Sequence, residues 1–499
     1  MNSHTKKTLI ALAIATTFSA QAYAEGTRHK ATVSQDGVEQ VATITQTDDR
    51  NITRVTQAGN NQDATVTQNG YWNESYVTST GDDNTVNTNQ TEDWQVSTIT
   101  IEGDSNTVTS TQAGYWNKSV NDITGDNNTV DITQAGDTNE SNVELIGGTN
   151  STSVDQTGND NFSVFRVQGN GNDGIISQEG NNNQAGMISL DLTPNVGNNN
   201  DVVLGQVGDS NLAGVRGVAG DDNTIEIMQE GNNNTGFVYA LTGNDNELSI
   251  DQDGNDNNVV LQFASGDDNN VDIMQNGNGN MVGDTKVAVI NGNNNSIDID
   301  QKGDTNLAEF EVTSNDNDVD LEQDGNNNYA VFGAYTGNDN DFDLSSDGDD
   351  NKISAFAVGE DNDIEISQEG DVNFAYVETV GNDNEIDVTQ DGAGENEATV
   401  SVIGNNNTDL VVAQDGDLNL VDLIITGDEN FADIAQTGSG NWVGGISGAT
   451  SFTVTGNENS LTVVQNGSDN LVEGMQMGSN NTIAATQVGD FNTATIVQN

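Results

Sequence analysis

The stretch GDNNTVDITQAGDTN, residues 125–139, alternates apolar and polar side chains between two turn-forming segments. Asn128, Val130, Ile132 and Gln134 share one parity, so on a β-strand they point to one face while the intervening Thr and Asp side chains point to the other. Val, Ile and Thr favour strands, whereas the flanking Gly, Asp and Asn favour turns. The stretch therefore predicts a strand of about six residues between two tight turns.

Nearly the same line recurs along the chain, so the period carries more information than any single copy. Steps of eleven residues from Gly59 to Gly180 land on Gly at eleven of twelve positions, with Glu92 as the exception. Gln recurs at twice that spacing, at Gln68, Gln90, Gln112, Gln134, Gln156 and Gln178. Two eleven-residue units therefore form one structural turn, and only the first of the two usually ends in Gln.

This periodicity predicts an all-β fold, a cross-β, amyloid-like β-solenoid built from strand-turn-strand rungs of about 22 residues. The rungs should stack about 4.8 Å apart, with two sheets about 10 Å apart across the core. The roughly forty units between Gln35 and Gln498 predict about twenty rungs.

Asn and Gln occupy the inward register of these predicted strands. Buried amides must be hydrogen-bonded, and in a stack of similar rungs each amide can pair with the copies above and below, as in cross-β ladders. The alternative, that they only decorate turns, does not explain their shared parity with the apolar residues. The predicted amyloid-core ladder is Gln68, Gln90, Gln112, Gln134, Gln156, Gln178, Asn106, Asn128, Asn150 and Asn172. The predicted turn glycines are Gly103, Gly114, Gly125, Gly136, Gly147 and Gly158.

The repeat loosens unevenly toward the C-terminus. We expect regular repeats over residues 35–180 and repeats with insertions over residues 181–499. The extra residues follow the Gly linked to a ladder Gln, as from Gly180 to Gly197, whereas the next unit, from Gly197 to Gly208, keeps eleven. The Gln-bearing sheet is therefore predicted to be constrained, and the opposite sheet or its corners to absorb the insertions.

The N-terminus has the features of an export signal. Lys6 and Lys7 precede a short apolar run, and a small-x-small site ends at Ala24. We therefore expect a signal peptide over residues 1–24, cleaved after Ala24, and a short N-terminal segment over residues 25–34. No later stretch is apolar for 18 residues, so we expect an exported protein without a membrane anchor.

The composition excludes several classes of function. With 79 acidic and 12 basic residues the formal net charge is −67, which argues against nucleic acid or anionic lipid as a partner. The chain has no Cys, and His29 is the one His after the expected leader, which argues against a zinc site and His-based catalysis. We expect no enzymatic activity and no cofactor, with loose divalent-cation binding at most.

The lines QAGNNQDATVTQ (57–68) and QVGDFNTATIVQ (487–498) resemble the curlin repeat, Q-x-G-x-x-N-x-A-x-x-x-Q. Curlins are the subunits of curli, the amyloid fibres on the surface of Gram-negative bacteria. The resemblance implies a secreted, pilus-like functional amyloid with roles in cell adhesion and biofilm. It also implies assembly with itself and other curlin-type subunits, an outer-membrane export pore and a nucleator. Whether the chain is a major or a nucleator-like minor subunit stays open.

Calcium binding is the main alternative. Segments such as GDDNN (266–270) and DGDDN (347–351) supply hard oxygen ligands, and a calcium-responsive β-roll adhesin would remain a monomeric acidic rod. Such β-rolls repeat every nine residues, however, and this chain repeats every eleven. Asn also often replaces Asp at the turns, which suits a left-handed backbone better than a cation cage.

Two outward features complete the expectations. Carboxylates stacked about 4.8 Å apart repel by about 0.9 kcal/mol in water, so assembly should speed up at higher ionic strength or near pH 4. The motif GYWN occurs at 70–73 and at 114–117, which places Trp72 and Trp116 at the same corner two rungs apart. They are either partly packed corner residues or an exposed surface for sugars or planar dyes.

Overall fold

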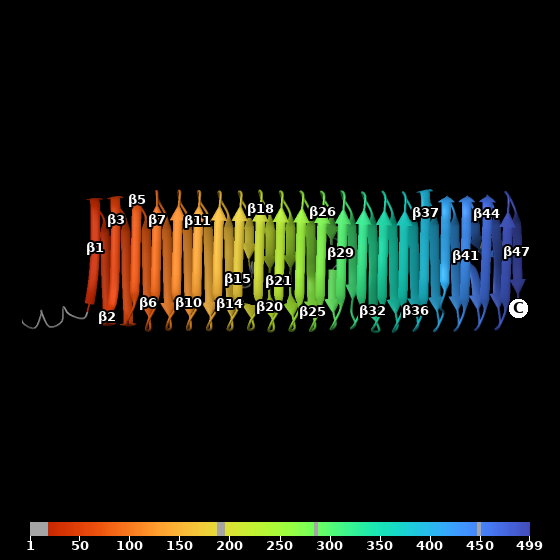
Figure 1. The fold of residues 1–499 in the computed structure, drawn as a ribbon, viewed down its shortest axis with the longest axis horizontal. Helices are drawn as coiled ribbons and strands as arrows, with labels where there is room; N and C mark the ends of the chain where they lie inside the picture. The colour runs from red at the N-terminus through yellow and green to blue at the C-terminus, as the bar shows by residue number, and fades with distance from the viewer. Residues whose placement is uncertain (1–17, 187–194, 284–287, 447–450) are drawn as a thin grey trace, which may run out of the picture. The chain divides into compact units, whose positions relative to one another are not determined.

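The computed structural model describes residues 18–186, 195–283, 288–446 and 451–499, which form β-strands joined by short corners (Figure 1). The chain divides into two compact units, unit 1 (residues 1–245) and unit 2 (residues 246–499), which we describe one at a time. None of the described residues belongs to a helix of the length and apolarity that crossing a membrane requires.

Unit 1 contains two parallel sheets, and the chain passes from one to the other at every corner. Sheet A of unit 1 consists of β1 (Phe18–Thr27), β3 (Gln40–Asp49), β5 (Asp63–Tyr71), β7 (Thr85–Thr91), β9 (Thr107–Ala113), β11 (Thr129–Ala135), β13 (Ser151–Thr157), β15 (Asp173–Glu179), β18 (Asp201–Val207) and β21 (Thr224–Glu230). Sheet B of unit 1 consists of β2 (Lys30–Val38), β4 (Ile52–Asn60), β6 (Glu74–Thr80), β8 (Val96–Glu102), β10 (Lys118–Thr124), β12 (Glu140–Ile146), β14 (Phe162–Gln168), β16 (Gln184–Gly186), β17 (Asn195–Val196), β19 (Leu212–Val215), β20 (Val218–Ala219), β22 (Thr235–Val238) and β23 (Leu241–Thr242).

Unit 2 repeats this arrangement. Its sheet A consists of β24 (Glu247–Asp253), β26 (Asn270–Asn276), β29 (Ser296–Lys302), β31 (Asp318–Asp324), β33 (Asp341–Asp347), β35 (Asp363–Glu369), β37 (Glu385–Gly394), β39 (Leu410–Asp417), β41 (Phe431–Ser439), β44 (Ser460–Ser468) and β46 (Thr482–Val488). Its sheet B consists of β25 (Asn258–Ser265), β27 (Met281–Val282), β28 (Ala288–Asn291), β30 (Leu307–Val312), β32 (Tyr329–Thr336), β34 (Lys352–Val358), β36 (Phe374–Val380), β38 (Glu397–Ile403), β40 (Leu420–Thr426), β42 (Trp442–Gly444), β43 (Phe452–Thr455), β45 (Leu471–Met477) and β47 (Thr493–Gln498).

The strand register confirms the predicted β-solenoid. In β11, Val130 lies opposite Val108 of β9 and Thr152 of β13, so each partner is one 22-residue turn away. Val130 and Ile132 are buried, and their outward neighbours along β11 are exposed. The apolar residues of one parity therefore form a core between sheets A and B, as the alternation predicts.

The corners are hydrogen-bonded from turn to turn as well. Gly125 N donates to Glu102 O at 2.8 Å, and Asn127 N donates to Asp104 O at 2.9 Å. Gly125 has a φ of 125° and Asn127 a φ of 59°, both in the left-handed region that Gly and Asn tolerate best. A Cβ on Gly125 would lie 2.0 Å from Gly147 O of the next turn. Gly at this position therefore meets both a backbone requirement and a steric one.

Most insertions fall on sheet B, although the register of sheet A also shifts once, between Asp391 and Gly394 of β37. Consecutive ladder Gln residues are 22 apart as far as Gln178, and Gln206 then follows at 28. Within that longer turn, β15 and β18 of sheet A still pair over seven residues, whereas β14 of sheet B is followed by the short strands β16 and β17. Sheet B is also broken at β27 and β28 and at β42 and β43. The unequal Gly spacing predicted this asymmetry.

The expected leader overlaps the first strand. The position of expected cleavage, after Ala24, lies within β1, which pairs in parallel with β3. Residues 1–17 of the expected signal peptide lie outside the described residues. The cleavage, and the boundaries at residues 24, 34 and 180, stay predictions.

We predict that Gly125→Ala destabilises the solenoid and that Gly217→Ala does not. The added methyl at residue 125 would meet Gly147 O at 2.0 Å at a φ of 125°, so we expect a loss of about 2–4 kcal/mol. Around Gly217 an added Cβ would have no neighbour within 4 Å. Thermal unfolding of both variants tests this, and equal melting temperatures would contradict the account.

Candidate functional site

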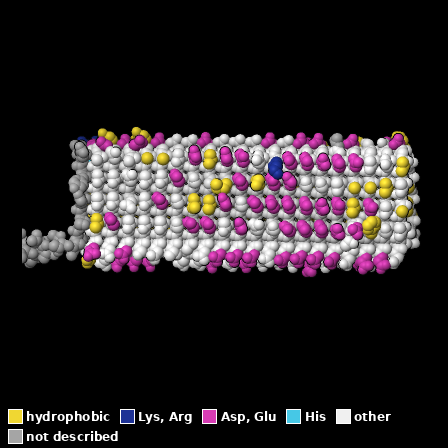
Figure 2. All heavy atoms as spheres, viewed as in Figure 1, with side chains coloured by type: hydrophobic (Ala, Val, Ile, Leu, Met, Phe, Trp, Pro, Cys, Tyr) yellow, Lys and Arg dark blue, Asp and Glu magenta, His cyan; other side chains and the backbone are white. Residues whose placement is uncertain are grey.

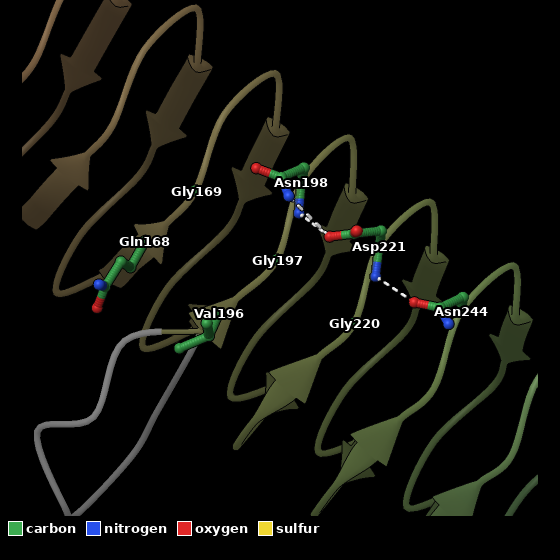
Figure 3. Close-up of a pocket in the computed structure, with 8 residues that line it drawn as sticks. All are labelled: Gln168, Gly169, Val196, Gly197, Asn198, Gly220, Asp221 and Asn244. Carbon is green, nitrogen blue, oxygen red and sulfur yellow. Dashed lines mark hydrogen bonds between the residues drawn. The ribbon is translucent and has the colours of Figure 1, made fainter.

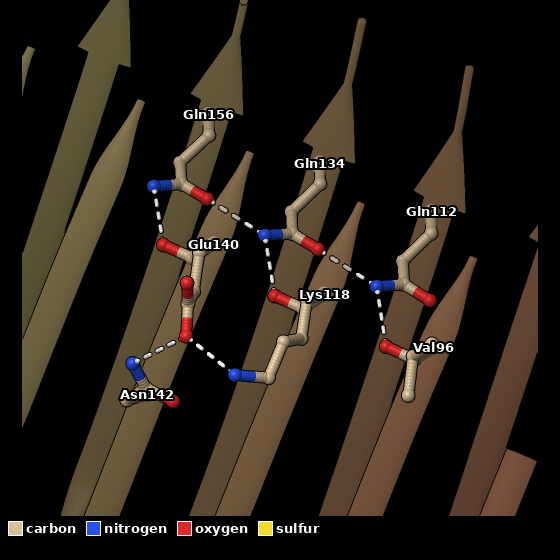
Figure 4. Close-up of polar contacts among 7 residues, drawn as sticks. All are labelled: Val96, Gln112, Lys118, Gln134, Glu140, Asn142 and Gln156. Atoms are coloured by element: carbon tan, nitrogen blue, oxygen red, sulfur yellow. Dashed lines mark hydrogen bonds and ion pairs between the residues drawn. The ribbon is translucent and has the colours of Figure 1, made fainter. Parts of the chain in front are cut away.

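The predicted Gln residues form a continuous ladder inside unit 1 (Figure 4). Gln112 Nε2 donates to Gln134 Oε1 at 2.9 Å, and Gln134 Nε2 donates to Gln156 Oε1 at 2.8 Å. The same bond joins Gln68 to Gln90, Gln90 to Gln112, and Gln156 to Gln178, each at 2.8 Å. All of these Gln side chains are buried. Each amide therefore takes its acceptor from the following turn.

Each ladder Gln also crosses the core, which the sequence did not predict. Gln112 Nε2 donates to Val96 O of β8 at 3.0 Å, and Gln134 Nε2 donates to Lys118 O of β10 at 3.1 Å. The second amide hydrogen thus binds a backbone carbonyl at the start of the facing sheet B strand. The ladder holds successive turns together along the stack, and the crosslinks hold the two sheets together at one corner.

The predicted Asn residues form a second ladder that runs in the opposite direction. Asn128 N and Nδ2 donate to Asn106 Oδ1 of the preceding turn at 2.9 and 3.0 Å, and Asn128 Nδ2 also donates to Gly147 O at 2.8 Å. Asn150 and Asn172 repeat the donations to the preceding turn. Because every Asn oxygen accepts two hydrogens, these buried amides are satisfied without water.

A third column of amides was missing from the predicted site. Asn139 N donates to Asn117 Oδ1 at 3.0 Å, and Asn161 N donates to Asn139 Oδ1 at 3.0 Å. These residues precede the sheet B strands and are buried. Their signal in the sequence is an Asn three residues after the second Gly of each turn, the same offset that identifies Asn128 after Gly125.

Unit 2 carries the Gln ladder with one exception. Gln301 Nε2 donates to Gln323 Oε1 and Gln368 Nε2 donates to Gln390 Oε1, both at 2.8 Å. Between these pairs the ladder position is Ser346, whose hydroxyl donates to Gln368 Oε1 at 3.4 Å. The shorter side chain keeps a long contact in the same direction, so the substitution weakens the column at one turn.

The acidic corners use their oxygens internally. Asp82 N donates to Asp104 Oδ1 at 2.7 Å, and Asp104 N donates to Asp126 Oδ1 at 2.8 Å. Asn170 Oδ1 accepts the same bond from Gly148 N at 2.8 Å, so Asp and Asn are interchangeable there. Within the described part of the chain, no three His, Cys, Asp or Glu side chains gather into a metal cage. The corner carboxylates act as acceptors for backbone amides.

A corner hollow of about 450 Å³ marks the first irregular turn (Figure 3). Asn198 N and Nδ2 donate to Asp221 Oδ1 at 2.7 and 2.9 Å, and Asp221 N donates to Asn244 Oδ1 at 2.9 Å. Gly169, Gly197 and Gly220 line the same hollow. The corner pattern therefore continues through the insertion.

The expected pair of tryptophans is a stack of three. Trp94 lies between Trp72 and Trp116, with ring centroids 5.0 and 4.8 Å apart and nearly parallel planes. Trp94 is 38% exposed and Trp116 is 57% exposed. The sequence motif missed Trp94 because Glu92 replaces the Gly of that corner, although 94 is 22 residues from both 72 and 116.

Outward carboxylates form columns on sheet A of unit 2. Asp272, Asp298, Asp320, Asp343, Glu365 and Asp387 lie opposite one another in successive strands. Figure 2 shows Asp and Glu in rows along the face in view. Desolvation by burial, followed by the neighbouring carboxylates, raises the pKa values of Asp298, Asp320 and Glu365. These columns therefore oppose close stacking when they are charged.

We predict that replacing Gln112, Gln134 and Gln156 together by Leu destabilises unit 1. The change removes the ladder bonds and leaves Gln90 Nε2 without its Gln112 acceptor, so a loss of about 3–6 kcal/mol is expected. The matched control is Thr109→Val with Thr111→Val and Thr133→Val, on the outer faces of β9 and β11. Denaturant unfolding compares the two triples. A control as unstable as the ladder variant would refute the ladder's role.

We predict that unit 2 gains stability as the pH falls from 7 toward 4. The folded-state pKa of Asp320 lies above its ordinary value, so its protonated form favours the folded state, and that stability is lost as the pH rises through the raised pKa. Asp320→Asn should raise the melting temperature at pH 7, because it removes a repulsion of about 0.9 kcal/mol per neighbouring carboxylate before salt screening. The change should also flatten the pH dependence.

The control is Asp422→Asn, because the strand neighbour of Asp422 in β38 is the uncharged Thr399. Thermal melts between pH 4 and 7 at fixed ionic strength measure the difference. An unchanged pH profile in Asp320→Asn would contradict the role given to the acidic column.

Comparison with known families identifies this repeat. The curlin associated repeat matches residues 59–91, 103–136, 125–158, 220–261, 292–317, 314–348, 359–392, 427–467 and 456–489. These matches cover more than half of the chain and fall in both units. A search of curated proteins found no significant match. The matched segments contain most of the Gln, Asn and Gly columns described above, and the chain belongs to the curlin family.

Proposed function

We propose that this protein is a secreted structural subunit of an extracellular, curli-like amyloid fibre, and that it has no catalytic role. Family membership supports assembly with copies of itself and with other curlin-type subunits. The buried ladders support self-assembly physically. Inside the stack each turn forms hydrogen bonds with the turns on both sides, whereas the first and last turns each leave the same donors and acceptors unpaired on one side. The fibre is proposed to act in cell adhesion and biofilm matrix at a Gram-negative cell surface.

The observation that carries the proposal is that each terminal strand of sheet B is paired along one edge. Within the described chain, β47 pairs along one edge with β45, and β2 pairs along one edge with β4. The last turn also exposes large apolar side chains, with Val488 74% and Phe491 76% exposed. Each end therefore presents a strand edge, and the last turn also presents apolar surface, that a second copy can cover.

The two ends also match each other in sequence. In sheet B, Gln occupies the ladder position of β2 and β4 (Gln35, Gln57) and of β45 and β47 (Gln476, Gln498). Gln35 Nε2 donates to Gln57 Oε1 at 2.8 Å. The interior strands of sheet B carry other residues at this position, as in the series Ser79, Ile101, Ile123, Leu145 and Val167.

This matching favours a head-to-tail join with one register. The strand TATIVQ of β47 can lie along KATVSQ of β2 with Ala, Thr and Gln each opposite their like. Gln476, Gln498 and the Gln35 and Gln57 of the next copy then form one ladder. Gln476 is buried, and both polar atoms of its side chain lack a partner among the described residues, so this column is under-satisfied without a neighbour.

The proposal also includes partners for export and nucleation, which rest on the likeness to other curlins. A curli-type outer-membrane pore would pass the chain, and a nucleator would start the fibre. A calcium-responsive, monomeric β-roll is not favoured, because the corner carboxylates already accept backbone N–H groups such as that of Asp104. Loose binding of divalent cations to the outward acids is compatible with the fibre.

Electron microscopy of purified residues 25–499 tests the proposal. We expect unbranched fibres that form with or without a calcium chelator, and faster at 500 mM than at 20 mM salt, because salt screens the outward acids. Monomeric rods that unfold in chelator, or a growth lag that lengthens with salt, would overturn the proposal.

We predict that Gln35→Leu and Gln498→Leu each slow fibre elongation from preformed seeds at least several-fold. Either change removes one amide from the ladder proposed to cross the join. Ser79→Ala is the control, because residue 79 occupies the same column two turns inside the end. Equal elongation rates for all three variants, at unchanged monomer stability, would rule out the proposed register.

A further inference from the structure

One corner of unit 1 departs from the amide-rich pattern of the others. Its third position is occupied in successive turns by Arg28, Arg50, Trp72, Trp94 and Trp116, all with φ between 63° and 69°. The same column continues with Thr138, Asp160 and Asn182. Asn and Asp are the residues that tolerate this left-handed backbone best. Trp at this position in three successive turns therefore departs from the residue types that this backbone conformation favours. Such departures occur at functional positions.

The Trp stack leaves its ring edges accessible. The rings of Trp72, Trp94 and Trp116 cover one another face to face, while Trp94 and Trp116 remain 38% and 57% exposed. Tyr71 and Tyr115, one residue before Trp72 and Trp116, are also exposed. The corner therefore presents a strip of aromatic edges and phenol groups along the stacking direction. Exposed Trp, Tyr and Arg side chains are the types that dominate binding surfaces.

The strip ends in a cationic hollow. Arg28, Lys30, Arg50, Ile52 and Trp72 line a depression of about 400 Å³, and Arg50 Cζ lies 4.5 Å from the centroid of the Trp72 ring. Arg54 lies two residues after Ile52 in β4. Four of the chain's 12 basic residues thus lie between residues 28 and 54 of a protein whose net charge is −67. A hollow on the acidic sheet of unit 2, by contrast, is lined by Asp363, Glu365, Glu385, Asp387 and Asp409 with three apolar residues.

We propose that this corner binds a carboxylate-bearing polysaccharide, a chain of uronic acid units. The guanidinium and ammonium groups supply donors for carboxylates, with Arg able to bind both oxygens at once. Arg50 Nε also lies 3.6 Å from Asp49 Oδ2, so Arg28 and Lys30 supply the rest of the positive charge. Ile52 and the edge of Trp72 supply an apolar wall for the C–H faces of a sugar ring. A hollow of about 400 Å³ lies in the size range of small-molecule sites and accommodates a short oligosaccharide.

The aromatic strip extends the site beyond the hollow. A linear polymer that enters at Arg28 and Lys30 can continue along the exposed edges of Trp94 and Trp116. Within the strip it passes Asp93, whose Oδ1 accepts the Tyr71 N–H at 2.8 Å. It then meets Asp137 and Asp160, whose charges repel further carboxylates. The site therefore takes one short stretch of polymer on each copy. Nucleic acid bases are disfavoured as the ligand, because Arg50 and the neighbouring indoles cover the Trp72 and Trp94 faces on which bases would stack.

Tryptophan fluorescence titration of residues 25–499, kept below the concentration at which fibres form, tests the proposal with oligogalacturonate. The control ligand is a neutral oligosaccharide of equal length. We expect oligogalacturonate to change the Trp emission, with affinity falling at least tenfold between 50 and 300 mM salt. Equal binding of the neutral oligosaccharide would overturn the assignment.

The variants separate the site from general charge attraction. Lys30→Gln with Arg50→Gln should weaken oligogalacturonate binding at least tenfold, whereas the matched double change Lys352→Gln with Arg166→Gln, away from this corner, should leave it unchanged. Trp94→Thr should weaken binding as well, and Thr is compatible with this corner because Thr138 occupies the same column. Isothermal titration supplies a readout that does not depend on Trp.

Two further outcomes would contradict the proposal that this corner binds a carbohydrate. If polyglutamate binds as tightly, with the same dependence on Lys30 and Arg50, the corner is a site for acidic peptides. If the two double variants bind alike, the cationic hollow has no special role. Seeded fibre growth of Trp94→Thr keeps this result separate from the proposed fibre function, since residue 94 lies outside the joining strands β2 and β47 and this variant is expected to elongate fibres whether or not it binds the glycan.

Discussion

The need of every buried amide for a partner governs this structure. A Gln side chain in an apolar core is destabilising when it is alone, and stabilising when its carbonyl and both amide hydrogens are used. Gln134 meets this need by donating to Gln156 and Lys118 O while accepting from Gln112. Those acceptors are available only if the next turn places its own Gln at the same height, as it does even across the 28 residues from Gln178 to Gln206. The constant register of the Gln-bearing strands of sheet A follows from that requirement.

The other features adapt to this constraint. Insertions are tolerated on sheet B, where most interior turns hold an apolar residue instead of Gln at the ladder position, as at Ile101, Leu145 and Val167. Sheet A keeps strands of seven residues through the longer turns. Apolar contacts accept small changes of geometry, whereas an amide ladder does not, because hydrogen bonds depend strongly on distance and angle. Charge is confined to the outer faces and the corners. At these positions the charged side chains limit association between turns, which would otherwise associate readily along their whole length.

The period of Gly and Gln, together with the parity of Val130 and Ile132, was enough to predict the solenoid, its two sheets and the sheet that carries the insertions. The bonds that cross the core were not predictable, because they depend on which strand start faces each Gln. Glu309 illustrates the same limit. Its parity points outward, yet it is 1% exposed and accepts a hydrogen bond from the Tyr329 hydroxyl at 2.9 Å. Burial and this carboxylate raise the pKa of Tyr329 to about 12. The GYWN motif does not include Trp94, because the corner of Trp94 lacks the Gly that begins the motif.

The central claim is that the ladder which joins turns within a chain also joins one chain to the next. A cryo-electron microscopy map of the fibre that separates individual strands measures this directly. The account predicts an uninterrupted strand spacing of about 4.8 Å across the junction in sheet B, with Gln498 of one copy beside Gln35 of the next. A map in which copies associate side by side, or in which the strand spacing breaks between them, would contradict it.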